Sequence, residues 1–242
     1  MIAISVNKET LIVDDLMQEI LMKKRSPGSK LPSENELADK YHVPRFTARN
    51  ALNKLEERGY IYSKQGKGRF LNNESIQIQL SLTGKVSFTE KMENMGYELK
   101  TENICCERIT YDPTIFRILN VDEKEEVFQI GRLRYIDEEP IAIHYSFVSR
   151  SKFPNIVVDG PNILSMFSYY REYGINQFAS NKTLLSVTFP TSEEQEMLSS
   201  KSMVPLIVVE SDCIDAETGN VLEHTKIVYR SDRFKYDITM DA

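Results

Sequence analysis

Residues 27–71 decide the fold of the first third of this chain, and they read PGSKLPSENELADKYHVPRFTARNALNKLEERGYIYSKQGKGRFL. Ser33 is followed three residues later by Glu36, a capping box that predicts the start of a helix. Pro44 suits the first turn of a following helix, and Gly59 suits the position just after its end. The stretch therefore predicts two helices joined by a short turn at residues 42–44.

Two short strands are expected after this pair of helices. Residues 60–62 (YIY) and 69–71 (RFL) predict a hairpin around the segment QGKG at 65–68. Upstream, Ile12, Leu16 and Ile20 recur every four residues and predict an earlier helix. Helices followed by a glycine-tipped hairpin describe a winged helix-turn-helix. A small helical bundle with arginines on its surface is the alternative.

Charge is distributed unevenly along the 242 residues. Residues 1–73 hold 13 Lys/Arg and 9 Asp/Glu, a net charge of +4, whereas residues 74–242 hold 17 and 27, a net charge of −10. Residues 40–73 alone carry 8 basic and 2 acidic side chains, a net charge of +6. This basic stretch indicates a polyanionic partner, with a solvated charged surface as the alternative. Within it, Arg45, Arg49 and Asn53 share one exposed helix face because they are spaced i, i+4, i+8.

Residues 8–72 resemble the DNA-binding domain of GntR-type transcriptional regulators. The resemblance is carried by PGSKLPSENELA at 27–38, VPRFTARNAL at 43–52, GYI at 59–61 and QGKGRF at 65–70, and Pro44, Phe46 and Arg69 depart from the residues usual at their positions. It implies a homodimer that binds a palindromic operator in double-stranded DNA. The expected DNA-binding residues are Ser33, Asn35, Arg45, Thr47, Arg49, Asn53, Gly66, Lys67, Gly68 and Arg69.

A polar segment, NNES at 72–75, predicts a linker. We therefore expect a winged helix-turn-helix domain at residues 1–72, a linker at 73–79 and a second domain at 80–242. In the second domain, strands are expected at 98–111, 127–136, 141–148, 181–189, 206–215 and 221–229, and helices at 87–95, 113–119, 162–172 and 191–198. Turns at 137–140 and 217–220 make two antiparallel hairpins, so the fold class is α+β with an antiparallel sheet.

Two features of the second domain indicate an anion site. Arg132 and Arg134 lie two apart on a predicted strand, so both side chains point to the same face. Two such guanidinium groups repel each other unless an anion or acidic side chains lie between them, and their planar forks suit phosphate or carboxylate. Ser87 forms a capping box with Glu90, which presents backbone N–H groups and the hydroxyl groups of Ser87 and Thr89. The alternative is that the arginines pair with glutamates and that Ser87 only caps a helix.

This region also resembles the UTRA effector-binding domain of the HutC branch of GntR regulators, which has a chorismate-lyase-like fold. The matching segments are SFTEKM at 87–92, RLR at 132–134 with EP at 139–140, LE at 222–223 and YRSDRF at 229–234. The resemblance implies a small anionic effector, for which we expect a sugar phosphate before a carboxylate. The implied effector-binding residues are Ser87, Phe88, Thr89, Arg132, Arg134, His144, Ser165, Phe167, Glu223 and Tyr229. His144 stands where related sites often have an acidic residue.

These features favour a one-component transcription factor, expected to be a repressor, whose DNA affinity changes when the effector binds. An enzyme of chorismate-lyase type with an appended winged helix is one alternative, and a partner-binding module is another. The 3 histidines and scattered carboxylates offer no convincing catalytic set. The cysteines and histidines lack zinc-ligand spacing, so we expect no metal and no cofactor. Because no apolar run is long enough for a membrane helix and Lys8 interrupts any signal-peptide core, we expect a cytoplasmic protein.

Overall fold

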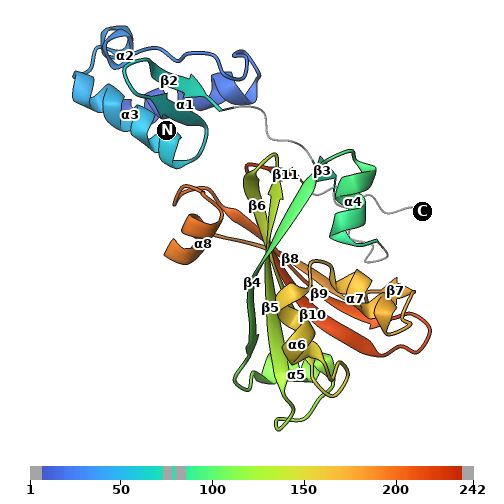
Figure 1. Ribbon diagram of the computed structural model, residues 1–242. Coiled ribbons are helices and arrows are strands. Elements are labelled where there is room, and N and C mark those ends of the chain that lie inside the picture. The colour runs from blue at the N-terminus through green and yellow to red at the C-terminus, as the bar shows by residue number, and fades with distance from the viewer. Residues whose placement is uncertain (1–6, 73–77, 80–85, 236–242) are drawn as a thin grey trace. The chain divides into compact units, whose positions relative to one another are not determined.

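The computed structural model describes residues 7–72, 78–79 and 86–235, and Figure 1 labels its helices and strands. The chain divides into two compact units. The first comprises Met1–Ile76, Phe189–Gln195 and Ser200–Val204, and the second comprises Gln77–Thr188, Glu196–Ser199 and Pro205–Ala242. The expected boundaries at 1–72, 73–79 and 80–242 stay predictions, and residues 73–77 of the expected linker lie outside the described residues.

The first unit contains α1 (Lys8–Leu21), α2 (Glu34–Tyr41) and α3 (Arg45–Glu57), followed by the hairpin of β1 (Ile61–Lys64) and β2 (Gly68–Leu71). Ser33 and Glu36 form the expected capping box at the start of α2. Pro44 precedes α3 rather than lying in its first turn, since its ψ of 144° is extended. Gly59 follows α3 with a φ of 77°, a conformation that glycine adopts without steric cost.

Apolar residues from these helices and the hairpin make one core. Its buried members are Ile12, Val13, Leu16, Leu31, Leu37, Ala48, Ala51, Leu52, Leu55, Ile61 and Leu71. β1 pairs antiparallel with β2, with Ile61 opposite Leu71 and Lys64 opposite Gly68. The expected helix-turn-helix with a small wing is confirmed.

The described residues of the second unit form an antiparallel sheet of seven strands. The strands are β4 (Leu99–Arg108), β5 (Val127–Ile136), β6 (Glu139–Ser149), β7 (Phe178–Ala179), β8 (Thr183–Thr188), β9 (Leu206–Asp215) and β10 (Val221–Arg230). Their order is β4-β5-β6-β10-β9-β7, and β8 also pairs with β9 (Figure 1). The helices are α4 (Phe88–Asn94), α5 (Pro113–Leu119), α6 (Ile156–Asp159) and α7 (Met166–Glu172), with a 3₁₀ turn at Gly160–Asn162. Helix α8 (Ser192–Met197) has residues assigned to both units. The expected antiparallel α+β class is confirmed.

Some elements differ from the sequence expectation. The helix expected at 162–172 begins only at Met166, because Ser165 is its cap and accepts a hydrogen bond from the backbone N–H of Ser168. Strands β3 (Ile78–Gln79) and β11 (Phe234–Lys235), which pair parallel, were not anticipated because two residues carry no periodic pattern. No helix within the described ranges is both long and apolar enough to cross a bilayer.

Candidate functional site

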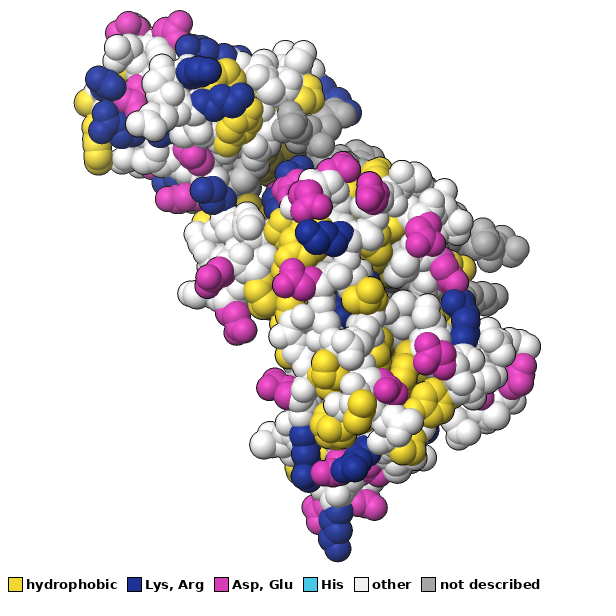
Figure 2. Space-filling model, in the orientation of Figure 1, with side chains coloured by type: hydrophobic (Ala, Val, Ile, Leu, Met, Phe, Trp, Pro, Cys, Tyr) yellow, Lys and Arg dark blue, Asp and Glu magenta, His cyan; other side chains and the backbone are white. Residues whose placement is uncertain are grey.

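A groove in the first unit lies between the start of α2, helix α3 and the hairpin. It is lined by Pro32, Ser33, Glu34, Asn35, Arg45, Leu52, Ser63, Lys64, Gly66, Gly68 and Arg69. Figure 2 shows Lys and Arg side chains on the surface of this unit, interspersed with Asp and Glu. Many of the residues expected to bind DNA therefore share one concave face.

Glu34 pairs with both arginines at the start of α3. One of its carboxylate oxygens lies 2.8 Å from Nε of Arg45, and the other lies 3.2 Å from Nε of Arg49. Partial burial opposes ionisation of Glu34, but hydrogen bonds from Arg49 and Arg45 prevail and lower its pKa. The two arginine side chains stay 61% and 48% exposed. They can therefore still reach a polyanion, while Glu34 offsets part of their charge.

Arg69 lies on β2 and its side chain turns back toward α3. It donates hydrogen bonds to the side-chain oxygen of Asn53 and, at 3.4 Å, to the backbone carbonyl of Arg49. Its Nε also lies 3.7 Å from the carboxylate of Glu56, and its side chain is only 17% exposed. Arg69 and Asn53, both expected to bind DNA, thus contact each other and join the wing to α3.

The other residues expected to bind DNA lie at the helix N-termini and the hairpin tip. Ser33 accepts a hydrogen bond from the backbone N–H of Glu36 and remains exposed, as does Asn35. Thr47 is half-buried in the first turn of α3, whereas Gly66 and Lys67 form the exposed turn between β1 and β2. Their DNA contacts stay predictions.

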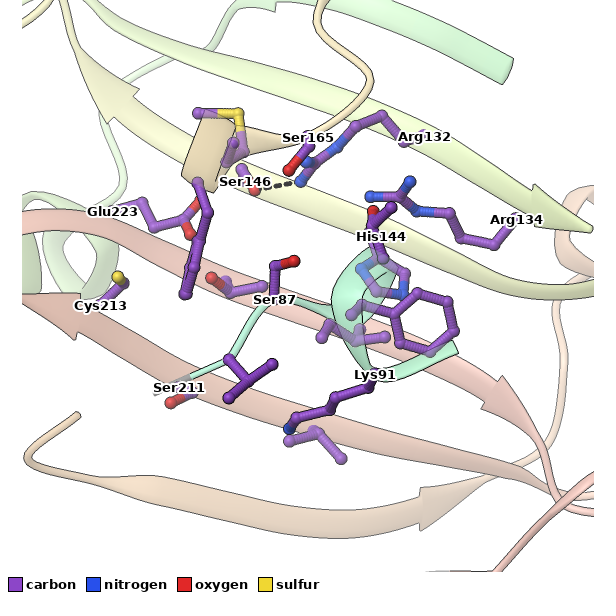
Figure 3. Close-up of a pocket in the computed structure, with 18 of the residues that line it drawn as sticks. Ser87, Lys91, Arg132, Arg134, His144, Ser146, Ser165, Ser211, Cys213 and Glu223 are labelled. Carbon is purple, nitrogen blue, oxygen red and sulfur yellow. Dashed lines mark hydrogen bonds between the residues drawn. The ribbon is translucent and has the colours of Figure 1, made fainter. Parts of the chain in front are cut away.

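All the residues expected to bind the effector line one pocket in the second unit (Figure 3). They are Ser87, Phe88, Thr89, Arg132, Arg134, His144, Ser165, Phe167, Glu223 and Tyr229. The empty space among the lining side chains measures about 860 Å³, including the part open to solvent. Contact between these residues and a ligand stays a prediction.

The register of the sheet explains why these side chains converge. Residues directly opposite each other in antiparallel strands lie on the same face of the sheet. Arg132, His144, Ile227 and Val209 form one such row, and Ser146, Thr225 and Ser211 form the next, with Glu223 opposite Cys213 beyond them. These rows make the floor of the pocket, and α4, which begins after Ser87, contributes another wall (Figure 3).

Arg132 and Arg134 are almost completely buried, with 3% and 2% of their surface exposed. Arg132 donates a hydrogen bond to the Ser146 hydroxyl, whereas Arg134 donates to the Thr101 hydroxyl and, at 2.9 Å, to the carbonyl of Leu164. The Nε atoms of both arginines lack a hydrogen-bond partner within the described residues. None of the ion pairs found there includes either arginine. The alternative in which glutamates pair with them at contact distance is therefore not seen.

Burial shifts the pKa values of the ionisable groups in the pocket. It lowers the pKa values of both guanidinium groups, and for Arg134 the neighbouring charge of Arg132 acts in the same direction. His144 has its pKa held well below the usual range by burial and then by Arg134 and Arg132, so its ring is neutral. Burial raises the pKa of Glu223, and the charge of Arg132 opposes that rise.

Two further buried atoms in the pocket lack partners. The Nε2 atom of His144 and the Oε2 atom of Glu223 make no hydrogen bond with any described residue. The His144 ring is held by aromatic contacts, with its centroid 4.6 Å from that of Phe88 and 5.8 Å from that of Tyr229. The pocket therefore offers unpaired donors at the arginines and an unpaired acceptor at Glu223.

Sequence reasoning missed many lining residues, namely Val86, Lys91, Ser146, Met166, Thr183, Val209, Ser211, Asp212, Cys213, Thr225 and Ile227. Strand periodicity could have found some of them. Ser146 lies two residues beyond His144, and Thr225 and Ile227 lie between Glu223 and Tyr229 at the same spacing. Lys91 follows Ser87 by one helical turn. The residues of β8 had no predicted neighbour from which to count, and those of β9 depend on the register of the predicted hairpin with β10, which shifts between Val221 and Glu223.

Two protein-family descriptions match the chain. "Bacterial regulatory proteins, gntR family" matches residues 9–71, and "UTRA domain" matches residues 94–235. The HTH-type transcriptional repressor NagR of Bacillus subtilis (strain 168) is 26% identical over 230 residues, which cover 95% of this chain and 93% of that protein. The HTH-type transcriptional regulator TreR of the same organism is 28% identical over 236 residues, or 96% of each chain. The mannosyl-D-glycerate transport/metabolism system repressor MngR of Escherichia coli (strain K12) is 23% identical over 232 residues, covering 94% of this chain and 93% of that protein. These relatives are transcriptional regulators rather than enzymes.

Solved structures share the fold. The crystal structure of PhnF from Mycobacterium smegmatis superposes with a TM-score of 0.61 at 20% identity, covering 96% of this chain and 99% of that chain. The possible transcriptional regulator YydK from Bacillus subtilis superposes with a TM-score of 0.55 at 22% identity, covering 98% of this chain and 100% of that chain. The combination of a winged helix-turn-helix and an antiparallel α+β unit thus recurs in both.

Proposed function

The chain belongs to the GntR family of bacterial regulators and carries a UTRA domain, and from this premise we propose that it is a repressor controlled by a phosphorylated sugar. DNA binding resides in the helix-turn-helix, and effector binding resides in the UTRA domain. Its relatives include the transcriptional repressor NagR and a repressor of a mannosyl-D-glycerate transport/metabolism system. The proposal adds the chemical class of the effector and the assembly.

One observation carries the proposal for a phosphate. Two buried guanidinium groups face the same pocket, each with an unpaired Nε, and no described ion pair includes them. Glu223 acts on Arg132 as a counter-charge beyond ion-pair distance, but no described carboxylate does so for Arg134. A buried charge without a counter-charge costs several kcal/mol, on the order of the penalty for one desolvated ion. A phosphate ester carries up to about two negative charges and strong acceptor oxygens, so it can accept charge-assisted hydrogen bonds from both arginines. A carboxylate offers half that charge, and a neutral sugar offers none.

The rest of the pocket supports a sugar at the other end of the ligand. Hydroxyl groups of Ser146, Ser211 and Thr225 line the floor, and the unpaired Oε2 of Glu223 can accept a hydrogen bond from a ligand hydroxyl. The neutral ring of His144 lies beside Phe88, which offers an apolar surface to a sugar ring. The relative MngR is named for mannosyl-D-glycerate, which is in keeping with a carbohydrate ligand.

The assembly we propose is a homodimer joined through β8. This strand pairs with β9 on one side, and the described residues supply no strand for its other side. Its side chains Leu184, Leu185 and Val187 are 50%, 44% and 64% exposed, and an edge strand with exposed apolar residues readily pairs with another chain. A two-fold dimer presents two winged helices to a palindromic site, which doubles the base contacts.

Sedimentation equilibrium of the full chain tests the dimer. We expect a mass of about twice 28.0 kDa for the natural chain and a shift toward the monomer for a variant with Leu185→Asp and Val187→Asp. The control is Val158→Asp on α6, where Val158 is 74% exposed and distant in sequence from β8. The proposed assembly is contradicted if the natural chain is a monomer. It is also contradicted if the double variant has the same mass as the natural chain.

Fluorescence anisotropy tests the proposed response. A duplex is first selected from a random-sequence library with the full chain. The affinity of the chain for this duplex is then measured in the presence of a hexose 6-phosphate and in the presence of the parent hexose. Because a ligand shifts an equilibrium only through its different affinities for the two states, an effector must change the operator affinity. We expect a change of about tenfold or more with the 6-phosphate, the shift that about 1.4 kcal/mol of coupling produces. Equal effects of a sugar and its phosphate contradict the phosphate proposal.

A further inference from the structure

Phe46 is an exposed aromatic residue in the first turn of α3. Its side chain is 68% exposed, and it belongs to none of the hydrophobic clusters formed by the described residues. A single exposed apolar residue on an ordinary surface needs no explanation. Here the residue directly follows Arg45 at the start of the helix that carries the exposed Arg45 and Arg49.

The geometry of α3 places Phe46 in the middle of its open face. Residues buried against the core are Ala48, Ala51, Leu52 and Leu55. With 3.6 residues per turn, Phe46 lies about half a turn around the helix from the centre of that buried stripe. Arg49 and Asn53 flank it one and two turns further along. The phenyl ring therefore projects from the surface that a recognition helix presents to DNA.

The major groove contains one prominent apolar feature. The C5-methyl group of thymine projects into it, and apolar side chains contact that methyl group in preference to the donors and acceptors of other bases. N-terminal residues of a recognition helix are the ones that reach base edges. A phenylalanine at the second position of α3 thus has the position and the chemistry to contact thymine.

We infer that Phe46 is a specificity-determining residue that packs on a thymine methyl group in each half-site of the operator. Arg45 and Arg49 supply the charge that brings the helix to the duplex, whereas Phe46 selects thymine over cytosine at one position by burying the methyl group. The inference rests on DNA binding by the helix-turn-helix and does not depend on the identity of the effector.

The test replaces thymine by deoxyuridine, which removes only the methyl group. Duplexes are selected from a random library with the full-length natural chain, and each thymine of the selected half-site is replaced in turn. We expect one position in each half-site at which the replacement weakens binding about fourfold, the fold-change that corresponds to one buried methyl group. With Phe46→Ala, the thymine and deoxyuridine duplexes should bind equally at that position.

Phe46→Leu is the matched control, since it keeps an apolar side chain and should retain part of the thymine preference. Thermal unfolding should be the same for all three proteins because the side chain is exposed. Selected half-sites without a fixed thymine, or an undiminished deoxyuridine effect in Phe46→Ala, overturn the inference. Phe46→Ala should still bind DNA, with the same salt dependence as the natural chain. This result shows that the variant has lost base selection and not DNA binding itself.

Discussion

The guanidinium group of Arg69 on β2 donates a hydrogen bond to the side-chain oxygen of Asn53 on α3. This contact joins the wing to the helix that carries Arg45 and Arg49. Two residues that we expected to contact DNA separately are thus coupled. An arginine of the wing thus makes a direct contact with the recognition-helix candidate α3.

The first prediction follows from that coupling. Arg69→Ala and Asn53→Ala should each weaken binding to the selected duplex. The loss of binding free energy in the double variant should be little more than the larger of the two single losses. The reason is that either change removes the hydrogen bond between Arg69 and Asn53, so the second change has no such bond left to remove. Anisotropy titrations of the two single variants and the double variant measure the interaction energy, which we expect to be about 1.5–3 kcal/mol for a charged hydrogen bond.

Lys67→Ala provides the comparison for this cycle. Lys67 lies on the exposed hairpin turn. The losses of binding free energy caused by Lys67→Ala and Asn53→Ala should therefore add in the double variant. If the losses for Arg69 and Asn53 also add, the two residues contact DNA independently and the coupling has no functional role.

Glu34 leads to the second prediction. Its carboxylate offsets part of the charge of Arg45 and Arg49, so Glu34→Gln should tighten binding to non-specific duplex about three- to tenfold at low salt. The slope of log affinity against log salt should steepen. Asp39→Asn, which removes an exposed charge elsewhere on α2, should have a smaller effect. Weaker binding by Glu34→Gln indicates instead that Glu34 is needed to orient the arginines.

The third prediction concerns the arginines themselves. Arg45→Ala or Arg49→Ala should each cost about 1–3 kcal/mol at the selected site. Stability should hardly change, because surface ion pairs contribute little. Arg108→Ala, at an exposed arginine of the second unit, is the matched control and should bind as the natural chain does. Natural affinity in both α3 variants means that α3 is not the recognition helix.

The fourth prediction concerns pH and His144. Burial, together with Arg134 and Arg132, keeps the pKa of His144 well below its ordinary value of 6.5. As the pH falls below that value, the unfolded chain binds a proton that the folded chain does not, so folding stability falls. Each pH unit contributes up to about 1.4 kcal/mol.

Urea unfolding at pH 7 and pH 5.5 measures this effect. His144→Gln should lose less stability over this interval than the natural chain, since it has no proton to exclude. An unchanged acid sensitivity in His144→Gln removes His144 as its source.

The sequence predicted the elements whose start and stop signals are local. The capping boxes at Ser33 and Ser87 and the Asp112–Pro113 start of α5 placed helices within a residue or two. Local signals do not report tertiary contacts, however. They could not show that Glu34 reaches across to α3 or that Arg69 turns inward.

The pocket was predicted only in part for the same reason. The two-residue spacing of Arg132 and Arg134 places both on one face of β5 whatever the rest of the fold does. The contribution of β9, in contrast, depends on the register of its hairpin with β10, which shifts between Val221 and Glu223. The turn at 217–220 predicts that these two strands pair but does not predict this shift, so Val209 and Ser211 could not be assigned opposite Ile227 and Thr225.

The most direct test of the central claim is isothermal titration calorimetry of the full chain and Arg134→Gln. The ligands are glucose, fructose and glucosamine, each paired with its 6-phosphate. Arg134→Gln keeps a hydrogen-bond donor and removes the charge, and Arg108→Gln is the control. We predict that the natural chain binds a 6-phosphate at least about tenfold more tightly than the parent sugar, a difference of about 1.4 kcal/mol, and that Arg134→Gln loses this preference. A ligand that binds equally with and without its phosphate, or that binds Arg134→Gln undiminished, contradicts the account.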